Sequence, residues 1–369
     1  MIKICHITSV HSQNDIRIFE KECCALAVYG YDVHLVASGI SKTKNAVHIH
    51  GMGDIPKSRI QRMFCFTKRV YEKALEIDAP IYHFHDPELI PFGLRLKKLG
   101  YKVIFDSHEN VLEQFAEKTY IPLIIRKVVN NLFIHYLEWA CSQFDAIVSV
   151  DPYICDRYKK LNEHVVMVAN FPRIEDSKCV QRKPQNKYIA FAGGIDAQWN
   201  HDIIIKAIEN VDDIQYVLCG RANEGYLSYL KTLPGWTRVD FRGEVSHEEA
   251  LEILRGSIAG VALCSYSKNT NGIIGTLGNT KLFEIMMCGV PVICTNFEQW
   301  KEIVLHYQCG FVLHYHDNME LEKIIKQLLS DPEASANMGL NGMNAVHKYS
   351  WESQEINLKR MYDELTVNL

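Results

Sequence analysis

Residues 275–295 read GTLGNTKLFEIMMCGVPVICT and place a turn, a helix and a strand in immediate succession. A loop rich in glycine and hydroxyl residues opens an apolar helix that carries one carboxylate, Glu284. The helix ends at Gly289, and residues 290–293 begin a buried strand. Free backbone N–H groups and the positive end of the helix dipole suit a phosphate group. Glu284 follows this loop near the reach of a sugar hydroxyl, so the segment predicts a nucleotide-sugar site.

Short apolar runs alternate with helical patterns along the chain, beginning with a strand at 2–8, a helix at 17–29 and a strand at 33–37. Such alternation predicts an α/β fold with parallel sheets and right-handed crossovers. The polar stretch 171–187 interrupts this alternation of strands and helices. It contains two prolines and no periodicity, which is typical of a linker. We therefore expect two doubly wound domains that face each other across a cleft, at 1–172 and 188–348, joined by a linker at 173–187. Ligands of such sheets bind at the carboxyl ends of the strands.

The composition is that of an ordinary globular protein of 369 residues, with 47% hydrophobic and 23% charged residues. A net charge of −4 does not favour nucleic acid as a partner. The N-terminus MIKICHITSV lacks the features of a signal peptide, and no run reaches about 18 apolar residues, so we expect a cytoplasmic protein. The 12 cysteines are scattered without a CxxC pair and are expected to be reduced and buried.

Two cofactor classes are disfavoured by the sequence. The first strand is followed by SVHSQNDIR at 9–17, without the GxGxxG turn of nicotinamide and flavin enzymes. Histidines in His-x-His pairs share one face of a strand, as metal ligands do, but no third ligand stands at a supporting spacing. We therefore expect no metal site at any of the three pairs, His48/His50, His83/His85 and His314/His316.

Four segments resemble a known family when they are taken in order. They are HFHDPELIPFGLRLKKLGYKVIFDSHE at 83–109, FRGEVSHEEALEILRGSIAGVALCSY at 241–266, KLFEIMMCGVPVI at 281–293 and YSWES at 349–353. Together they resemble the retaining glycosyltransferases of family 4, of the bacterial polysaccharide-biosynthesis type. The resemblance implies the GT-B fold of two Rossmann-like domains. It also implies that a final helix at 349–369 packs back towards the N-terminal domain.

The resemblance assigns roles to individual positions. Glu284 matches the second glutamate of the family's E-x7-E motif, which binds the ribose hydroxyls of the donor. The backbone of Gly278, Asn279 and Thr280 would receive the diphosphate, although an ordinary helix cap is the structural alternative. Further donor-side assignments fall on Thr276, Arg221, Gly194 and Val245, and the catalytic assignments fall on His85, His108 and Lys281.

The chain departs from the family pattern at two places. Thr276 stands where the first glutamate of E-x7-E is expected, and Gly194 and Asn200 stand where the family has an arginine and lysine pair for the diphosphate. Lys281 is our first candidate for the missing positive charge, because it lies in the first turn of the phosphate-facing helix. A solvated lysine is the alternative, since a cation there opposes the helix dipole. Other candidates for the charge are His201, Arg221 and Arg242.

The resemblance implies retaining transfer without a protein nucleophile, in which a donor phosphate oxygen takes the acceptor proton. The expected partners are a nucleotide-diphosphate sugar and a glycan or lipid-linked glycan acceptor, with no cofactor and no metal. Residues 56–73, PKSRIQRMFCFTKRVYEK, interleave six basic residues with apolar ones and suit an anionic membrane surface, or else a solvated helix. The chain would then be peripheral on the cytoplasmic membrane. A nucleotide-sugar-binding protein without activity and a GT-B epimerase are the alternative functions.

Overall fold

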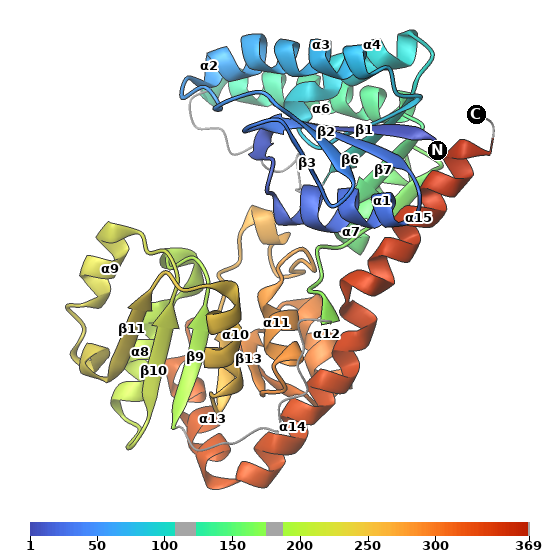
Figure 1. The fold of residues 1–369 in the computed structure, drawn as a ribbon. Helices are drawn as coiled ribbons and strands as arrows, with labels where there is room; N and C mark the ends of the chain where they lie inside the picture. The colour runs from blue at the N-terminus through green and yellow to red at the C-terminus, as the bar shows by residue number, and fades with distance from the viewer. Residues whose placement is uncertain (108–122, 175–186, 368–369) are drawn as a thin grey trace. The chain divides into compact units, whose positions relative to one another are not determined.

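The computed structural model describes residues 1–107, 123–174 and 187–367. Most of the predicted linker, residues 175–186, lies outside these ranges. The chain divides into two compact units, each built around its own sheet (Figure 1). Unit 1 comprises Met1–Asn170 and Trp351–Leu369, and unit 2 comprises Phe171–Ser350. The predicted boundaries at 172 and 349 lie close to these divisions.

Unit 1 contains an eight-stranded sheet in the order β3-β4-β2-β1-β5-β6-β7-β8. Its strands are parallel except for the edge pair of β3 and β4. We did not predict this edge pair, because β3 (KTK) has no apolar residue and β4 (VHIHG) alternates histidine with single apolar residues. The strands are β1 (Lys3–Ser12), β2 (Asp32–Ser38), β3 (Lys42–Lys44), β4 (Val47–Gly51), β5 (Ile81–Phe84), β6 (Lys102–Ser107), β7 (Ala146–Ser149) and β8 (Val165–Met167).

Helices surround the sheet of unit 1 (Figure 1). The predicted helix at 17–29 is present as a π-helix, η1, that continues into α1. The helices are η1 (Ile16–Cys23), α1 (Cys24–Val28), α2 (Arg59–Gln61), η2 (Arg62–Phe66), α3 (Thr67–Ile77), η3 (Pro87–Leu89), α4 (Ile90–Lys98), α6 (Leu123–Gln143), α7 (Pro152–Tyr158) and α15 (Trp351–Thr366).

The two faces of this sheet belong to two separate apolar cores. Side chains alternate along a strand, so Cys5 and Ile7 of β1 join the core with α3, α4 and α6, whereas Ile4 joins the core with η1, α1 and α15. Tyr82 and Ile81 of β5 divide in the same way. Burial on both faces explains why the central strands read as continuous apolar runs.

The C-terminal helix α15 completes the second of these cores. Trp351, Leu358, Met361 and Tyr362 are buried there. The side chain of Gln354 also accepts a hydrogen bond from the backbone N–H of Ala169 at 3.0 Å. The helix therefore belongs to unit 1 although unit 2 precedes it in the chain, as the GT-B resemblance implies.

Unit 2 contains a parallel six-stranded sheet in the order β11-β10-β9-β12-β13-β14. The chain first builds outward from β9 through β10 to β11 and then crosses to β12 on the other side of β9. The topological switch point consequently lies between β9 and β12. The strands are β9 (Tyr188–Ala192), β10 (Gln215–Cys219), β11 (Val239–Gly243), β12 (Ala259–Ala262), β13 (Val292–Thr295) and β14 (Gly310–Leu313).

The helices of unit 2 begin at side chains that suit a helix start. Asn223, Ser246 and Asp317 each accept a hydrogen bond from a backbone N–H in the first turn of α9, α10 and α13. The helices are η5 (Ala197–Trp199), α8 (His201–Glu209), α9 (Glu224–Leu230), η6 (Pro234–Arg238), α10 (His247–Arg255), η7 (Lys268–Thr270), α11 (Lys281–Met287), α12 (Glu298–His306), α13 (Asn318–Ser330), α14 (Pro332–Ala345) and η8 (Val346–Tyr349).

Packing of α15 should contribute measurably to the stability of unit 1. Leu358 is fully buried, so Leu358→Ala should lower the free energy of unfolding of this unit by about 2–5 kcal/mol. Ile356 lies on the same helix and is 53% exposed, so Ile356→Ala should change it by no more than about 0.5 kcal/mol. Urea unfolding followed by tryptophan fluorescence measures both, and equal losses would contradict this packing.

Candidate functional site

Unit 2 carries a cavity at the carboxyl ends of its strands. The cavity has a volume of about 440 Å³ and lies where β9 and β10 end, against α10 and α11. It borders β9, the strand at the topological switch point. Open α/β sheets bind their ligands at this position. The cavity is therefore the candidate site of unit 2.

Five of the predicted site residues line this one cavity. Arg221 comes from the loop after β10, and Val245 from the loop after β11. Thr280, Lys281 and Glu284 come from the start of α11. Residues separated by about sixty positions in sequence are thus brought together around one space.

Lys281 is the half-buried cation of the cavity. Its Nζ lies 5.2 Å from the ring centroid of Phe191 and 5.1 Å from that of Trp199, within the range of cation–π contacts. Burial lowers its pKa, against the opposing effect of the nearby Glu284 carboxylate. Among the residues that the structure describes, no carboxylate forms an ion pair with Lys281. An anionic ligand would compensate its charge.

Glycines at the strand ends make room for this lysine. A Cβ on Gly193 would lie 2.0 Å from Nζ of Lys281, and Gly193 has a φ of +149°. A Cβ on Gly220 would lie 1.8 Å from the carbonyl oxygen of Gly193. Both glycines line the cavity, and only glycine permits this close approach.

Glu284 is the polar residue in the middle of an apolar helix. Its neighbours Leu282, Phe283 and Ile285 are buried, whereas Glu284 is half-buried and lines the cavity. Thr280 Oγ1 donates a hydrogen bond to Glu284 Oε1 at 3.1 Å. The carboxylate is therefore oriented by the first turn of its own helix, and it retains capacity to accept ligand hydroxyls.

The loop before α11 differs from our expectation of open backbone amides. The N–H of Gly278 donates to Thr276 Oγ1 at 3.0 Å, and the N–H of Lys281 donates to Asn279 Oδ1 at 3.1 Å. Trp300 Nε1 further anchors the loop by donating to the carbonyl oxygen of Thr276 at 2.9 Å. The N–H of Gly278 is thus paired within its own loop, and Thr276 does not line the cavity; the diphosphate role of Gly278, Asn279 and Thr280 stays a prediction. Asn279 acts through its side chain as a cap for the helix.

Two of the candidates for the positive charge, His201 and Arg242, do not line the cavity. His201 is buried, its Nδ1 lies 2.8 Å from the hydroxyl of Tyr216, and burial lowers its pKa to about 3. Arg242 is exposed and forms an ion pair with Asp240 at 2.6 Å. Lys281 and Arg221 are the remaining cations of the prediction at the cavity.

The two positions that depart from the family's basic pair have different structural roles. Asn200 is buried, has a φ of +48°, and donates from Nδ2 to Leu263 O and Ser265 Oγ, both at 2.9 Å. It therefore fixes the start of α8 and faces no ligand. Gly194 lies beside Gly193, with no atom within 4 Å of where a Cβ would stand. Gly194 does not itself line the cavity.

His85 is buried inside unit 1. Its side chain is 1% exposed, with Nδ1 3.1 Å from Asp106 Oδ2 and Nε2 3.0 Å from His6 Nδ1. We expected a ligand-facing histidine at this strand end, but the acid on the neighbouring strand draws the imidazole inward. The other predicted catalytic histidine, His108, lies outside the described residues.

Our prediction missed Glu244 and His247, which also line the cavity. Glu244 directly follows β11 and His247 is the first residue of α10, so both lie just after a strand end, which was therefore a place to search. The glycines Gly193 and Gly220 were also missed as lining residues. The sequence feature that could have identified them is a glycine directly after a buried strand, in AFAGG and VLCG.

Comparison with known proteins identifies the family. The model of "Glycosyltransferase Family 4" matches residues 21–171, and that of "Glycosyl transferases group 1" matches residues 173–345. The two matches follow one another along most of the chain. The chain belongs to glycosyltransferase family 4. The recognition made from the four sequence segments is thereby confirmed.

Individual relatives are distant in sequence and similar in fold. An uncharacterised glycosyltransferase of Methanocaldococcus jannaschii is 22% identical over 66% of this chain and 66% of its own length, just under two thirds of that relative. Sucrose-phosphate synthase from Thermosynechococcus elongatus has a TM-score of 0.73 at 15% identity, covering 99% of both chains. HepE of Anabaena, solved with UDP and glucose, has a TM-score of 0.70 at 14% identity, covering 99% of this chain and 100% of its own. These likenesses confirm the GT-B fold.

Burial of His201 predicts a pH dependence of stability. Its pKa falls from 6.5 to about 3 on folding, so the unfolded chain binds more protons than the folded chain between these values. Its contribution to stability is complete above pH 6.5 and is lost as the pH falls towards 3. His201→Gln should therefore lose less stability on acidification, by up to about 1.4 kcal/mol per pH unit. Urea unfolding at a series of pH values measures this, and parallel curves for both proteins would contradict it.

Proposed function

We propose that the chain transfers a sugar from a nucleotide-diphosphate donor to a glycan acceptor, with retention of configuration. The observation that carries the proposal is the half-buried Lys281 beside Glu284 in one cavity at the switch point of unit 2. A cation and a carboxylate that lie three residues apart on α11 suit a ligand that offers both a diphosphate and vicinal hydroxyls. A structural neighbour from Anabaena was solved with UDP-glucose, a ligand of this chemistry.

In this proposal the donor is held by complementary charges. The Glu284 carboxylate accepts the ribose hydroxyls, with Thr280 fixing its orientation. The diphosphate lies towards Lys281, over the glycines at the ends of β9 and β10. Arg221 lines the same cavity and adds a second positive charge.

Lys281 supplies the main chemical contribution of unit 2. Negative charge grows on the departing diphosphate as the bond to the sugar breaks. An ammonium group that is already oriented and partly desolvated stabilises that charge more strongly than water does. The acceptor hydroxyl enters on the face that the diphosphate leaves, and a phosphate oxygen takes its proton, so no protein nucleophile is required. No step uses a cofactor or a metal.

Two rival functions give different outcomes in the same assay. A nucleotide-sugar-binding protein without activity would bind the donor and release nothing when acceptor is added. A GT-B epimerase would convert the donor sugar without any acceptor. Release of free nucleoside diphosphate only when a lipid-linked glycan acceptor is added supports the transferase.

Replacing Glu284 tests whether its carboxylate binds the donor. Glu284→Gln keeps the size of the side chain but removes its charge, and should weaken donor binding at least about tenfold, because charge-assisted hydrogen bonds contribute about 1.5–3 kcal/mol. Glu298 is an exposed acid in the first turn of α12, so Glu298→Gln is the matched control and should bind like the wild type. Thermal shift and calorimetry against a panel of nucleotide sugars measure both. Equal affinities in the two variants would remove Glu284 from the site.

We also propose that the acceptor is lipid-linked and that unit 1 docks on an anionic membrane through residues 56–73. Ile60 and Phe64 are 72% and 70% exposed, although both are apolar. Lys57, Arg59 and Lys68 are exposed beside them. An apolar ridge among cations suits the boundary between lipid headgroups and acyl chains. Within residues 1–107, 123–174 and 187–367, no helix has the length and apolarity needed to cross a bilayer.

Vesicle binding tests the docking segment. Phe64→Ser combined with Ile60→Ser should reduce flotation with phosphatidylglycerol vesicles at least about tenfold, since each side chain contributes about 1.5–3 kcal/mol when buried. Leu340→Ser, which removes a 48% exposed apolar residue from α14 of unit 2, is the control. Docking through this segment would be contradicted if the two variants floated equally. It would also be contradicted if the wild type floated equally with anionic and with uncharged vesicles.

A further inference from the structure

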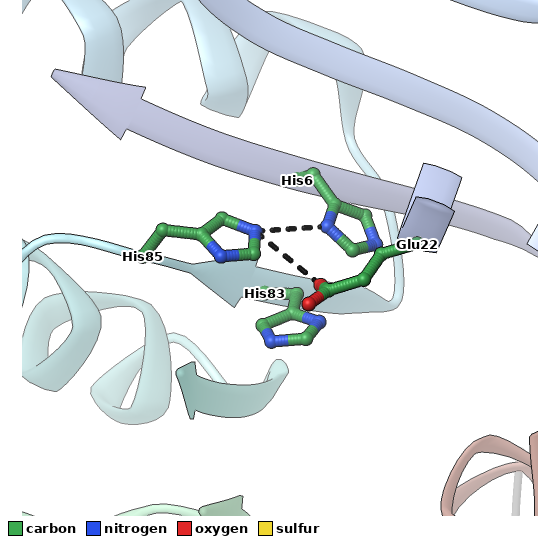
Figure 2. A group of neighbouring side chains, drawn as sticks. All are labelled: His6, Glu22, His83 and His85. Atoms are coloured by element: carbon green, nitrogen blue, oxygen red, sulfur yellow. Dashed lines mark hydrogen bonds and ion pairs between the residues drawn. The ribbon is translucent and has the colours of Figure 1, made fainter. Parts of the chain in front are cut away.

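Four buried side chains of unit 1 converge where the neighbouring strands β1 and β5 meet η1. His6 of β1 lies in register with His83 of β5, and His85 directly follows β5 on the same face. Glu22 reaches the same place from η1. Figure 2 shows the three imidazoles and the carboxylate directed towards one another. Each of the four is at most 1% exposed.

The ligand atoms of the four side chains surround a common centre. All four lie within 4.8 Å of one another. His6 Nδ1 and His85 Nε2 are 3.0 Å apart, and Glu22 Oε2 lies 4.0 Å from His85 Nε2. Tetrahedral zinc with bonds of about 2.0–2.1 Å would separate its ligand atoms by about 3.3 Å. The observed spacings therefore run from slightly shorter than this value to about 1.5 Å longer, a difference that rotations of the side chains can close.

The outer nitrogen of each imidazole is held by a second polar group. His85 Nδ1 lies 3.1 Å from Asp106 Oδ2, and His6 Nε2 lies 3.1 Å from the hydroxyl of Tyr362. His83 Nδ1 lies 2.9 Å from the same hydroxyl. This leaves Nδ1 of His6 and Nε2 of His83 and His85 towards the centre. Metal-binding histidines are typically oriented by such outer partners.

Within the described residues, two of the atoms that face the centre, His83 Nε2 and Glu22 Oε2, lack a hydrogen bond. His83 Nε2 and both carboxylate oxygens of Glu22 are buried without one in the part of the chain that the structure describes. Glu22 Oε1 has an ion-pair contact with Arg17 at 3.1 Å, whereas Oε2 faces the histidines. Buried polar atoms without partners are costly, and a cation at the centre would satisfy His83 and Glu22 together.

Arg17 pairs more extensively with Asp106 than with Glu22. Its guanidinium donates to both oxygens of Asp106, at 2.9–3.2 Å, and to Val168 O at 2.8 Å. The surroundings thus tolerate an added cation.

We propose that His6, Glu22, His83 and His85 bind a structural zinc ion. Three imidazoles and one carboxylate are a ligand set that suits Zn²⁺. Four protein ligands without exposure leave no open position, which is characteristic of a structural rather than a catalytic zinc. The ion would join β1, β5 and η1 and, through Tyr362, secure α15 to them. Our expectation of no metal at the His83/His85 pair considered only spacing along the chain, whereas the other two ligands come from neighbouring elements.

Metal analysis of the full chain, purified without a histidine tag or chelating resin, tests the site. We expect about one zinc per chain, and a cobalt-substituted protein with the visible absorption of a tetrahedral site. His83→Asn and Glu22→Gln should each weaken metal binding at least about tenfold, as measured by competition with a chromophoric chelator. His50→Asn changes a half-buried histidine of another His-x-His pair and should keep the metal.

Thermal unfolding of the wild type keeps the test decisive if a variant fails to fold. Removing the metal with a chelator should lower the Tm, and Zn²⁺ but not Mg²⁺ should restore it. The proposal would be overturned if the protein held no bound metal and its Tm were unchanged by the chelator and by Zn²⁺. Full zinc content in His83→Asn would also overturn it. Either result would show the cluster to be a metal-free polar network.

Discussion

A parallel sheet that is buried on both faces leaves only its strand ends for polar chemistry. Both units obey this constraint, because their central strands carry apolar residues towards two sides. In unit 2 the strand ends open into a cavity, with glycines at the ends of β9 and β10. In unit 1 the strand ends are polar as well, but η1 and α15 pack over them. One architectural rule thus yields an accessible site in one unit and a sealed cluster in the other.

The two sites differ in how their charges are compensated. The positive charge of Arg17 is matched internally by Asp106 and Glu22, so this guanidinium has no need of an external anion. The ammonium of Lys281 lies against aromatic faces, which compensate a cation only in part. Internal pairing favours a structural role, whereas incomplete compensation beside a cavity favours ligand binding.

Much of the fold and part of the site followed from the sequence. Alternating apolar runs and helical periods predicted two doubly wound domains, and an acid inside the apolar helix at 281–287 singled out Glu284. The sequence did not reveal that Thr276 and Asn279 hydrogen-bond to the backbone of their own loop, because such bonds depend on local conformation. It also did not reveal the burial of His201, or the meeting of Glu22 with His83. These depend on packing between elements that are distant along the chain.

The attachment of α15 has a consequence for the order in which the protein is made. Tyr362 contacts His6 and His83, so the last helix supplies a partner to the first strand. A ribosome releases β1 long before it releases α15, and all of unit 2 is synthesised in between. Until then the apolar face that Trp351 and Leu358 will cover stays unprotected. That core of unit 1 is therefore completed only after unit 2 has been synthesised.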